Sequence, residues 1–358
     1  MMRVLTACLL FLLLLSATPS AHAQAPTSAP SGTLHVGMIQ TKGYVVGSQL
    51  DGSGLARLNR LQGANSTWEL LGFSVPRVSA ISFDPSNASR VFLANGNGLV
   101  RSLDGGATWR IVTPWQVTEA QDIMVDPNDV NAIYAATAYG IWGSQDGGDS
   151  WLRLTPTDMM DDYTQSLVVD HTQTGRIIAG QEGGVRISDD RGATWQETTL
   201  RGMEVMEVAQ DARRGGHFLA ATLHDGLYRS TDGARTWSAI PLASMVPPAT
   251  AAGERAREGR TGVSVYSAAF DPTRAGRLVA AGWETGVLYS GDDGETWTQI
   301  GTSLPAISFY QVAFDPKRSG RIWAATVEQG LFYTDNQGRT WQSAGLDGTL
   351  IFDLSFSP

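Results

Sequence analysis

A short motif repeated along the chain constrains its fold more than any other feature. The pattern Ser-x-Asp-x-Gly-x-Thr-Trp first ends at Trp109, and a divergent copy ends earlier, at Trp68. Later copies end at Trp151, Trp195, Trp237, Trp297 and Trp341. Successive tryptophans are separated by 41, 42, 44, 42, 60 and 44 residues. A fixed period of this size is typical of folds in which each repeat is one supersecondary unit, so we predict seven units.

Each repeat contains four short apolar segments separated by turn residues. The first segment ends in Asp-Pro, as at Asp84-Pro85, and the fourth begins at the motif tryptophan. Four strands in about 40 residues, repeated radially, are typical of a β-propeller blade. Composition agrees, because glycine provides 40 of the 358 residues and charged residues only 17%. We therefore predict an all-β, seven-bladed β-propeller of four-stranded antiparallel blades with almost no helix.

The motif residues have a structural explanation. We expect Asp104 to accept hydrogen bonds from N–H groups of its own turn, and Gly106 to supply a positive φ. The tryptophans are expected to be buried between blades. A Ca²⁺ site is disfavoured because each turn offers one carboxylate, and we predict no metal and no cofactor. The same roles are expected for Asp104 and Trp109, Asp146 and Trp151, Asp190 and Trp195, Asp232 and Trp237, Asp292 and Trp297, and Asn336 and Trp341.

The two ends of the chain are expected to close the ring together. Residues 353–358 repeat the pattern of residues 80–85 and then stop. They are expected to supply the innermost strand of the first blade, which removes two exposed sheet edges. We place the other strands of that blade near 44–47, 54–57 and 68–71. An alternative is that residues 33–40 form the innermost strand.

The N-terminus has the pattern of a secretory signal. Arg3 precedes an apolar run over 4–15, and Ala21-His22-Ala23 provides a small-residue cleavage site. The run is shorter than the roughly 20 residues that span a bilayer. We predict a signal peptide over 1–23, a flexible leader over 24–32 and a single propeller over 33–358. The protein is then exported to the periplasm or the extracellular space, and its one cysteine, Cys8, is removed.

The repeats resemble the Asp-box (BNR) repeat of the sialidase and sortilin superfamily. The blade pattern F-D-P…A-A…G-L-x-x-S-x-D-G-G-x-T-W matches along residues 44–358. Sialidases typically carry an Arg-Ile-Pro motif, which is absent here, while xyloglucan hydrolases of this type use two propellers and sortilins ten blades. The chain is most similar to single, seven-bladed, exported propellers of the photosystem II stability/assembly factor type. That resemblance implies a scaffold that holds a protein partner.

A ligand site would lie on the face formed by two sets of loops around the central channel. The motif turns lie on the opposite face. The net charge of −9 and the acidic loops disfavour nucleic acid and favour cations, basic peptides or neutral sugars. A solvated rim without a ligand is the alternative. The candidate ligand contacts are Tyr139, Tyr163, Glu182, His224, Tyr266, Trp283, Glu284, Tyr310 and Glu328.

Four polar residues are expected at equivalent positions where the innermost strands begin: Asp122, Glu207, Gln311 and Asp353. Our preferred interpretation is a monomeric, non-catalytic propeller that binds a protein or peptide. The alternative is a carbohydrate-binding or glycoside-hydrolysing propeller, in which Asp122, Glu207 and Asp353 would provide acid/base catalysis.

One blade connection is longer than the others. The insertion over 243–262 contains Pro247-Pro248 and several arginines. Long loops in a compact domain are usually functional or disordered, so this segment is predicted to be either a surface excursion or a lid over the channel.

Overall fold

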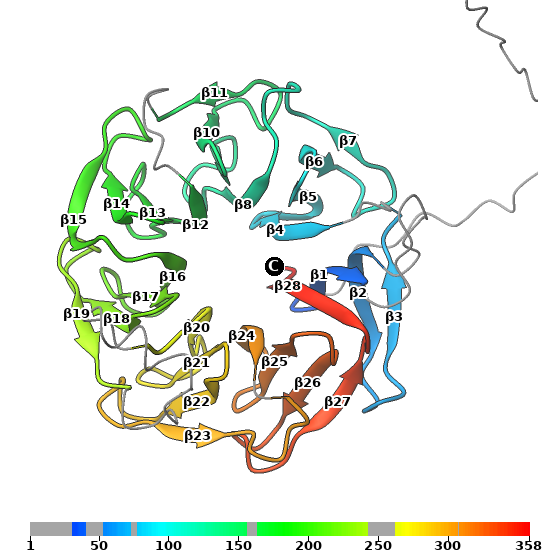
Figure 1. Cartoon of the computed structure of the whole chain (residues 1–358). Helices are drawn as coiled ribbons and strands as arrows, with labels where there is room; N and C mark the ends of the chain where they lie inside the picture. Colours follow the sequence, from blue (N-terminus) through cyan, green and yellow to red (C-terminus); the bar gives the residue numbers. More distant parts are fainter. Residues whose placement is uncertain (1–30, 41–52, 73–76, 156–162, 243–261, 307) are drawn as a thin grey trace, which may run out of the picture.

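The computed structural model describes residues 31–40, 53–72, 77–155, 163–242, 262–306 and 308–358, and these ranges contain strands and turns without helix. The strands form seven four-stranded antiparallel sheets that are arranged radially around a common centre (Figure 1). The predicted seven-bladed propeller is confirmed. Within the described ranges there is accordingly no helix of the length and hydrophobicity needed to cross a membrane.

Six blades are built from four consecutive strands, with the first strand innermost. Blade 2 contains β4 (Val78–Asp84), β5 (Asn87–Asn95), β6 (Gly98–Ser102) and β7 (Arg110–Ile111). Blade 3 contains β8 (Ala120–Val125), β9 (Ile133–Thr137), β10 (Gly140–Ser144) and β11 (Leu152–Arg153). Blade 4 contains β12 (Thr164–Val169), β13 (Ile177–Gln181), β14 (Gly184–Ser188) and β15 (Gln196–Arg201).

The remaining three of these six blades follow the same plan. Blade 5 contains β16 (Val205–Gln210), β17 (Phe218–Thr222), β18 (Gly226–Ser230) and β19 (Ser238–Ile240). Blade 6 contains β20 (Ser267–Phe270), β21 (Leu278–Gly282), β22 (Gly286–Ser290) and β23 (Thr298–Ile300). Blade 7 contains β24 (Phe309–Phe314), β25 (Ile322–Thr326), β26 (Leu331–Thr334) and β27 (Gln342–Gly345).

Blade 1 is assembled from both ends of the chain. Its strand order is β28 (Thr349–Phe356), β1 (Leu34–Gln40), β2 (Gly54–Arg60) and β3 (Thr67–Leu70). The C-terminal strand is therefore innermost, as predicted (Figure 1). The alternative, in which residues 33–40 form the innermost strand, is wrong because β1 is the second strand. The placement of the second strand at 44–47 was also wrong, because β1 occupies that place. Those four residues, like 1–30 and the insertion over 243–261, lie outside the described ranges.

The hydrophobic core lies between the blades. The second strands β9, β13, β17, β21 and β25 are buried along their whole length, whereas the outermost strands are largely exposed. Apolar side chains form seven clusters, each shared by two neighbouring blades and each including one motif tryptophan. Burial of these facing surfaces is what holds the ring together.

The motif turns have the hydrogen bonds that we expected. Ser102 Oγ donates to Asp104 Oδ1 (2.8 Å), Thr108 N donates to the same oxygen (2.8 Å), and Gly106 has a φ of 95°. In the last copy Thr340 N donates to Asn336 Oδ1 at 2.9 Å, so an amide can replace the carboxylate. Such bonds lower the pKa of Asp292 to about 2.

The tryptophans are less uniformly buried than we predicted. Only Trp151 and Trp297 are buried, with 8% and 7% of their surface exposed, while the other motif tryptophans are half-buried. This partial exposure follows from their position, because Trp68 lies in the exposed outermost strand of its blade and the other six directly precede theirs. Several indoles nevertheless bond to the preceding blade, as in Trp109 Nε1 to Leu71 O at 2.9 Å.

Candidate binding site in the central channel

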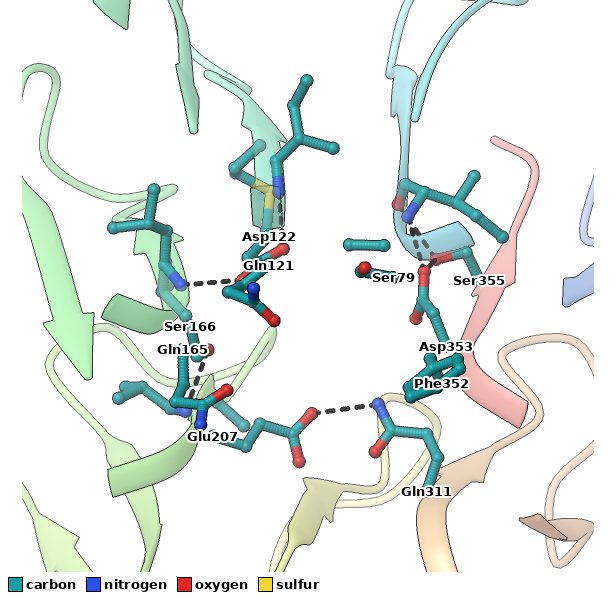
Figure 2. Close-up of a pocket in the computed structure, with 18 of the residues that line it drawn as sticks. Ser79, Gln121, Asp122, Gln165, Ser166, Glu207, Gln311, Phe352, Asp353 and Ser355 are labelled. Carbon is teal, nitrogen blue, oxygen red and sulfur yellow. Dashed lines mark hydrogen bonds between the residues drawn. The ribbon is translucent and has the colours of Figure 1, made fainter. Parts of the chain in front are cut away.

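The innermost strands enclose a cavity of about 440 Å³ on the axis of the ring (Figure 2). Residues of β4, β8, β12, β16, β24 and β28 line it, together with Tyr266 directly before β20. The cavity is therefore lined by residues at corresponding positions in the innermost strand of each blade, or just before that strand.

Seven residues occupy one equivalent position, which we call the inner ring. Each pairs with an alanine or glycine of the second strand in its own blade. In ring order from blade 1, the inner ring consists of Asp353, Ala80, Asp122, Ser166, Glu207, Ser267 and Gln311. The predicted equivalence of Asp122, Glu207, Gln311 and Asp353 is thus confirmed, and from blade 1 to blade 7 long and short side chains alternate.

The three inner-ring carboxylates each accept a backbone hydrogen bond from the next blade. Asp122 Oδ2 accepts from Leu167 N at 2.7 Å. Glu207 Oε2 accepts from Ala268 N at 2.9 Å, and Asp353 Oδ2 from Ile81 N at 2.7 Å. An innermost strand is a sheet edge, so these N–H groups have no strand partner and need another acceptor. The carboxylates therefore connect neighbouring blades.

In the other four blades the equivalent N–H group, that of the residue after the inner-ring position, donates to a different acceptor. Ser166 Oγ accepts from Val208 N and Ser267 Oγ from Val312 N, both at 3.2 Å. Where the preceding blade offers Ala80, Asp122 Oδ1 accepts from its own neighbour, Ile123 N, at 2.7 Å. Asp353 likewise accepts a bond from the N–H group that follows it in β28. The inner ring thus caps all seven edges.

Burial changes the acidity of these carboxyl groups. Desolvation raises the pKa of Asp122 and of Glu207 to about 7, and the pKa of Asp353 to about 6. The charge of Asp353 adds to the rise in pKa of both other groups. All three side chains are half-buried and line the cavity. Because their pKa values are raised to about 6 or 7, their charge changes close to neutral pH.

A second set of residues, which we call the bulge ring, directly precedes the inner ring and points into the cavity. In six blades this residue is unpaired at a β-bulge in the innermost strand. In blade 6, Tyr266 precedes the strand. Bulges commonly redirect side chains next to functional sites. The bulge ring consists of Ser79, Gln121, Gln165, Met206, Tyr266, Tyr310 and Phe352, all of which line the cavity.

The bulge ring is polar on one side and largely apolar on the other. Blades 2 to 4 contribute a serine and two glutamines, whereas blades 5 to 7 and blade 1 contribute methionine and aromatic rings. Tyr310 makes edge contacts with Tyr266 and Phe352, with centroid distances of 5.6 and 5.1 Å. Arg77 lies over the Phe352 ring at 4.7 Å and donates to Gln121 Oε1 at 2.6 Å. One guanidinium therefore joins the two halves.

The predicted ligand contacts fall into two groups. Tyr266 and Tyr310 line the cavity, and Tyr163 is close enough to Arg77 for that charge to act on its pKa, which burial raises. The others do not line the cavity and lie on turns between second and third strands, where Tyr139 and Trp283 are 59% and 49% exposed. This second group consists of Tyr139, Glu182, His224, Trp283, Glu284 and Glu328.

Sequence reasoning missed part of the cavity wall. Arg77, Ser79, Gln121, Gln165 and Phe352 were not singled out, although each belongs to or directly precedes the aligned first segment of its repeat. The signal available was positional, namely the residue that precedes each inner-ring residue. Among the described residues, no three His, Cys, Asp or Glu side chains are grouped closely enough to hold a metal ion.

Comparison with known proteins shows the fold and not a family. No known family profile and no curated protein matches the chain. A GH74 xyloglucanase from Xanthomonas campestris is similar over 90% of this chain and 56% of its own, with 17% identity and a TM-score of 0.65. A GH74 enzyme from Niastella koreensis is similar over 90% and 55%, with 18% identity and a TM-score of 0.61.

A third similar structure is YCF48 bound to a D1 peptide. It matches 80% of this chain and 84% of its own length, with 16% identity and a TM-score of 0.54. The chain therefore spans about half of the GH74 enzymes but most of YCF48.

Proposed function

We propose that the protein is an exported, monomeric, non-catalytic propeller that binds a protein or peptide partner through its loop face and channel mouth. The observation that carries this proposal is the bulge ring, in which amide and hydroxyl groups face methionine and aromatic rings across the cavity. Such a site offers a peptide side chain both apolar contact and hydrogen-bond partners. We infer that the repeats are Asp-box repeats and that the protein is a scaffold of the assembly-factor type.

Two further features support binding without catalysis. Asp122, Glu207 and Asp353 each hold a backbone N–H group of the next blade, which gives these carboxylates a structural task. YCF48, which resembles this chain over most of its length, has been solved with a bound peptide. The exposed Tyr139 and Trp283 around the mouth would extend the contact surface.

The alternative is carbohydrate binding or glycoside hydrolysis in the same channel. The pKa of Asp122 and that of Glu207, each raised to about 7, are in the range that a general acid needs. The fold is also similar to that of GH74 enzymes. The raised pKa values of Asp122 and Glu207 favour hydrolysis. The hydrogen bonds that the same two carboxylates accept from the next blade favour binding without catalysis.

A binding screen and a glycosidase panel on the purified protein distinguish the two functions. A peptide array should give ligands whose affinity falls at least tenfold in Tyr310→Phe or Gln165→Ala. Tyr139→Ala, which removes an aromatic ring outside the cavity, should have a smaller effect. Turnover of a glycoside that is abolished by Asp122→Asn or Glu207→Gln would establish the alternative and refute our preferred function.

A further inference from the structure

The cavity wall carries an excess of negative groups. Its ionisable side chains include three carboxylates, from β8, β16 and β28, and one guanidinium, that of Arg77. Figure 2 shows Asp122, Glu207 and Asp353 directed toward the cavity from different sides. Glu207 Oε1 accepts a hydrogen bond from Gln311 Nε2 at the long distance of 3.3 Å, so this oxygen is only weakly engaged. The cavity therefore offers carboxylate oxygens that could accept further hydrogen bonds from a ligand.

An unpartnered hydroxyl in the same wall independently indicates a missing ligand. Ser79 is only 7% exposed, lines the cavity, and its Oγ has no hydrogen-bond partner among the described residues. Buried hydroxyl groups in native proteins almost always have a partner. A ligand with a hydrogen-bond donor would supply one.

The shape and chemistry of the cavity select an organic cation. The three carboxylates are not grouped closely enough to hold one metal ion. The wall opposite the polar bulge residues is formed by Met206, Tyr266, Tyr310 and Phe352. An alkyl chain can pack against these side chains while a terminal ammonium with three donors faces the oxygens.

We propose that the channel binds a primary ammonium on an unbranched alkyl chain, namely a lysine side chain of the partner, with Glu207, Asp122 and Asp353 as counter-charges. This inference deepens the proposed function, because it assumes that the lysine comes from a protein or peptide. Arg77 is fixed between Phe352 and Gln121. Its positive charge places the ammonium away from that side of the mouth and toward Glu207.

Binding should release protons. Burial raises the pKa of Asp122 and of Glu207 to about 7 and that of Asp353 to about 6, so near neutrality part of the population is protonated. The other ionisable groups that face the cavity are Arg77, His171, Tyr266 and Tyr310. An arriving ammonium favours the ionised carboxylates, and its affinity should rise between about pH 6 and pH 8.

Isothermal titration calorimetry with Nα-acetyl-lysine N-methylamide tests the proposal. We expect binding at pH 8 and an affinity at least tenfold lower at pH 6. Glu207→Gln, which keeps an oxygen for Ala268 N, should weaken binding at pH 8 at least tenfold, and Asp122→Asn provides a second such variant. Ser79→Ala should weaken it severalfold without lowering the melting temperature. Glu295→Gln, which removes a charge from an exposed motif turn on the opposite face, is the matched control and should bind normally.

Several results would overturn the inference. They are the absence of binding at millimolar probe, equal binding of the Nε-acetylated probe, a pH-independent affinity, and unchanged affinity in folded Glu207→Gln and Asp122→Asn. If peptides still bind in a Tyr310-dependent way while the lysine probe fails, only the lysine assignment is wrong. If the probe binds but no peptide does, the ammonium site stands and the protein-partner function is wrong.

Discussion

Replacing Asp122 by asparagine should change the pH dependence of stability in a specific direction. Burial raises the pKa of this carboxyl from 3.8 to about 7. Below pH 4 the group is neutral in both states, so it makes no pH-dependent contribution. Between pH 4 and 7 the folded protein holds a proton that the unfolded chain has released, and the free energy of unfolding therefore falls as pH rises. Above pH 7 this loss is complete.

The size of the effect follows from the same two pKa values. With about 1.36 kcal/mol for each pH unit over which the proton is held, the wild-type protein loses about 2.5 kcal/mol from this group between pH 5 and pH 8. Asparagine cannot ionise and avoids this loss. It also places an amide where one carboxylate oxygen accepts from Ile123 N or Leu167 N, which costs about 1–3 kcal/mol at every pH.

Urea unfolding at pH 5, 6, 7 and 8, followed by tryptophan fluorescence, measures this difference. Asp122→Asn should be less stable than wild type at pH 5 and should gain on it by about 2.5 kcal/mol by pH 8. Glu182→Gln removes the same charge from an exposed position and serves as the control. A stability difference between Asp122→Asn and wild type that stays constant from pH 5 to pH 8 would refute the reasoning.

Three further substitutions test the fold. Trp297→Ala, which empties a buried site between blades 5 and 6, should lower the free energy of unfolding by about 3–5 kcal/mol, and a loss under about 1 kcal/mol would contradict its place in the core. Gly184→Ala should destabilise by more than about 2 kcal/mol in the same denaturation assay, because Gly184 has a φ of 126° and a Cβ there would collide with Leu200 O. Gly183→Ala is its control, with nothing within 4 Å of the added Cβ, and equal losses in both would contradict the steric argument. Ala132→Arg should raise the melting temperature, because Asp126 Oδ2 is buried without a partner among the described residues. In three other blades the equivalent aspartate has an arginine six residues later near this oxygen, namely Asp84 with Arg90, Asp271 with Arg277 and Asp315 with Arg321. The expected gain is about 1 kcal/mol, and a lower melting temperature would mean that the buried pair does not repay its desolvation.

The repeat motif predicted the fold because it specifies a turn chemically. Asp104, Gly106 and Thr108 can be recognised from residue type and spacing, and their hydrogen bonds are those expected. For blade 1 the C-terminal innermost strand was predicted correctly, whereas the second strand was misplaced at 44–47 instead of 34–40. Nothing local in 34–40 distinguishes a second strand from a first, since pairing with β28 decides it.

The candidate site was predictable only in part. Asp122, Glu207 and Asp353 were found by alignment on the Asp-Pro segments, because the inner ring keeps a constant offset from them. Tyr266 and Tyr310 were predicted as ligand contacts, but the other members of the bulge ring were missed because a bulge is a property of strand register, not of residue type. Ser79, Gln121, Met206 and Tyr310 have nothing in common as side chains, and only the pairing between strands shows that all four point inward.

The alternation of the inner ring meets a parity problem, because seven is odd. A cycle of long and short side chains closes without conflict only when the number of blades is even. Here the mismatch falls between Gln311 and Asp353, two long neighbours at the seam where the C-terminal strand enters the ring. A neutral amide occupies the first of these positions, and it bonds across to Glu207 instead of capping the next strand. A relative with one blade more or fewer could alternate strictly and would have no such seam, so a change in blade number would also rearrange the charges along the axis.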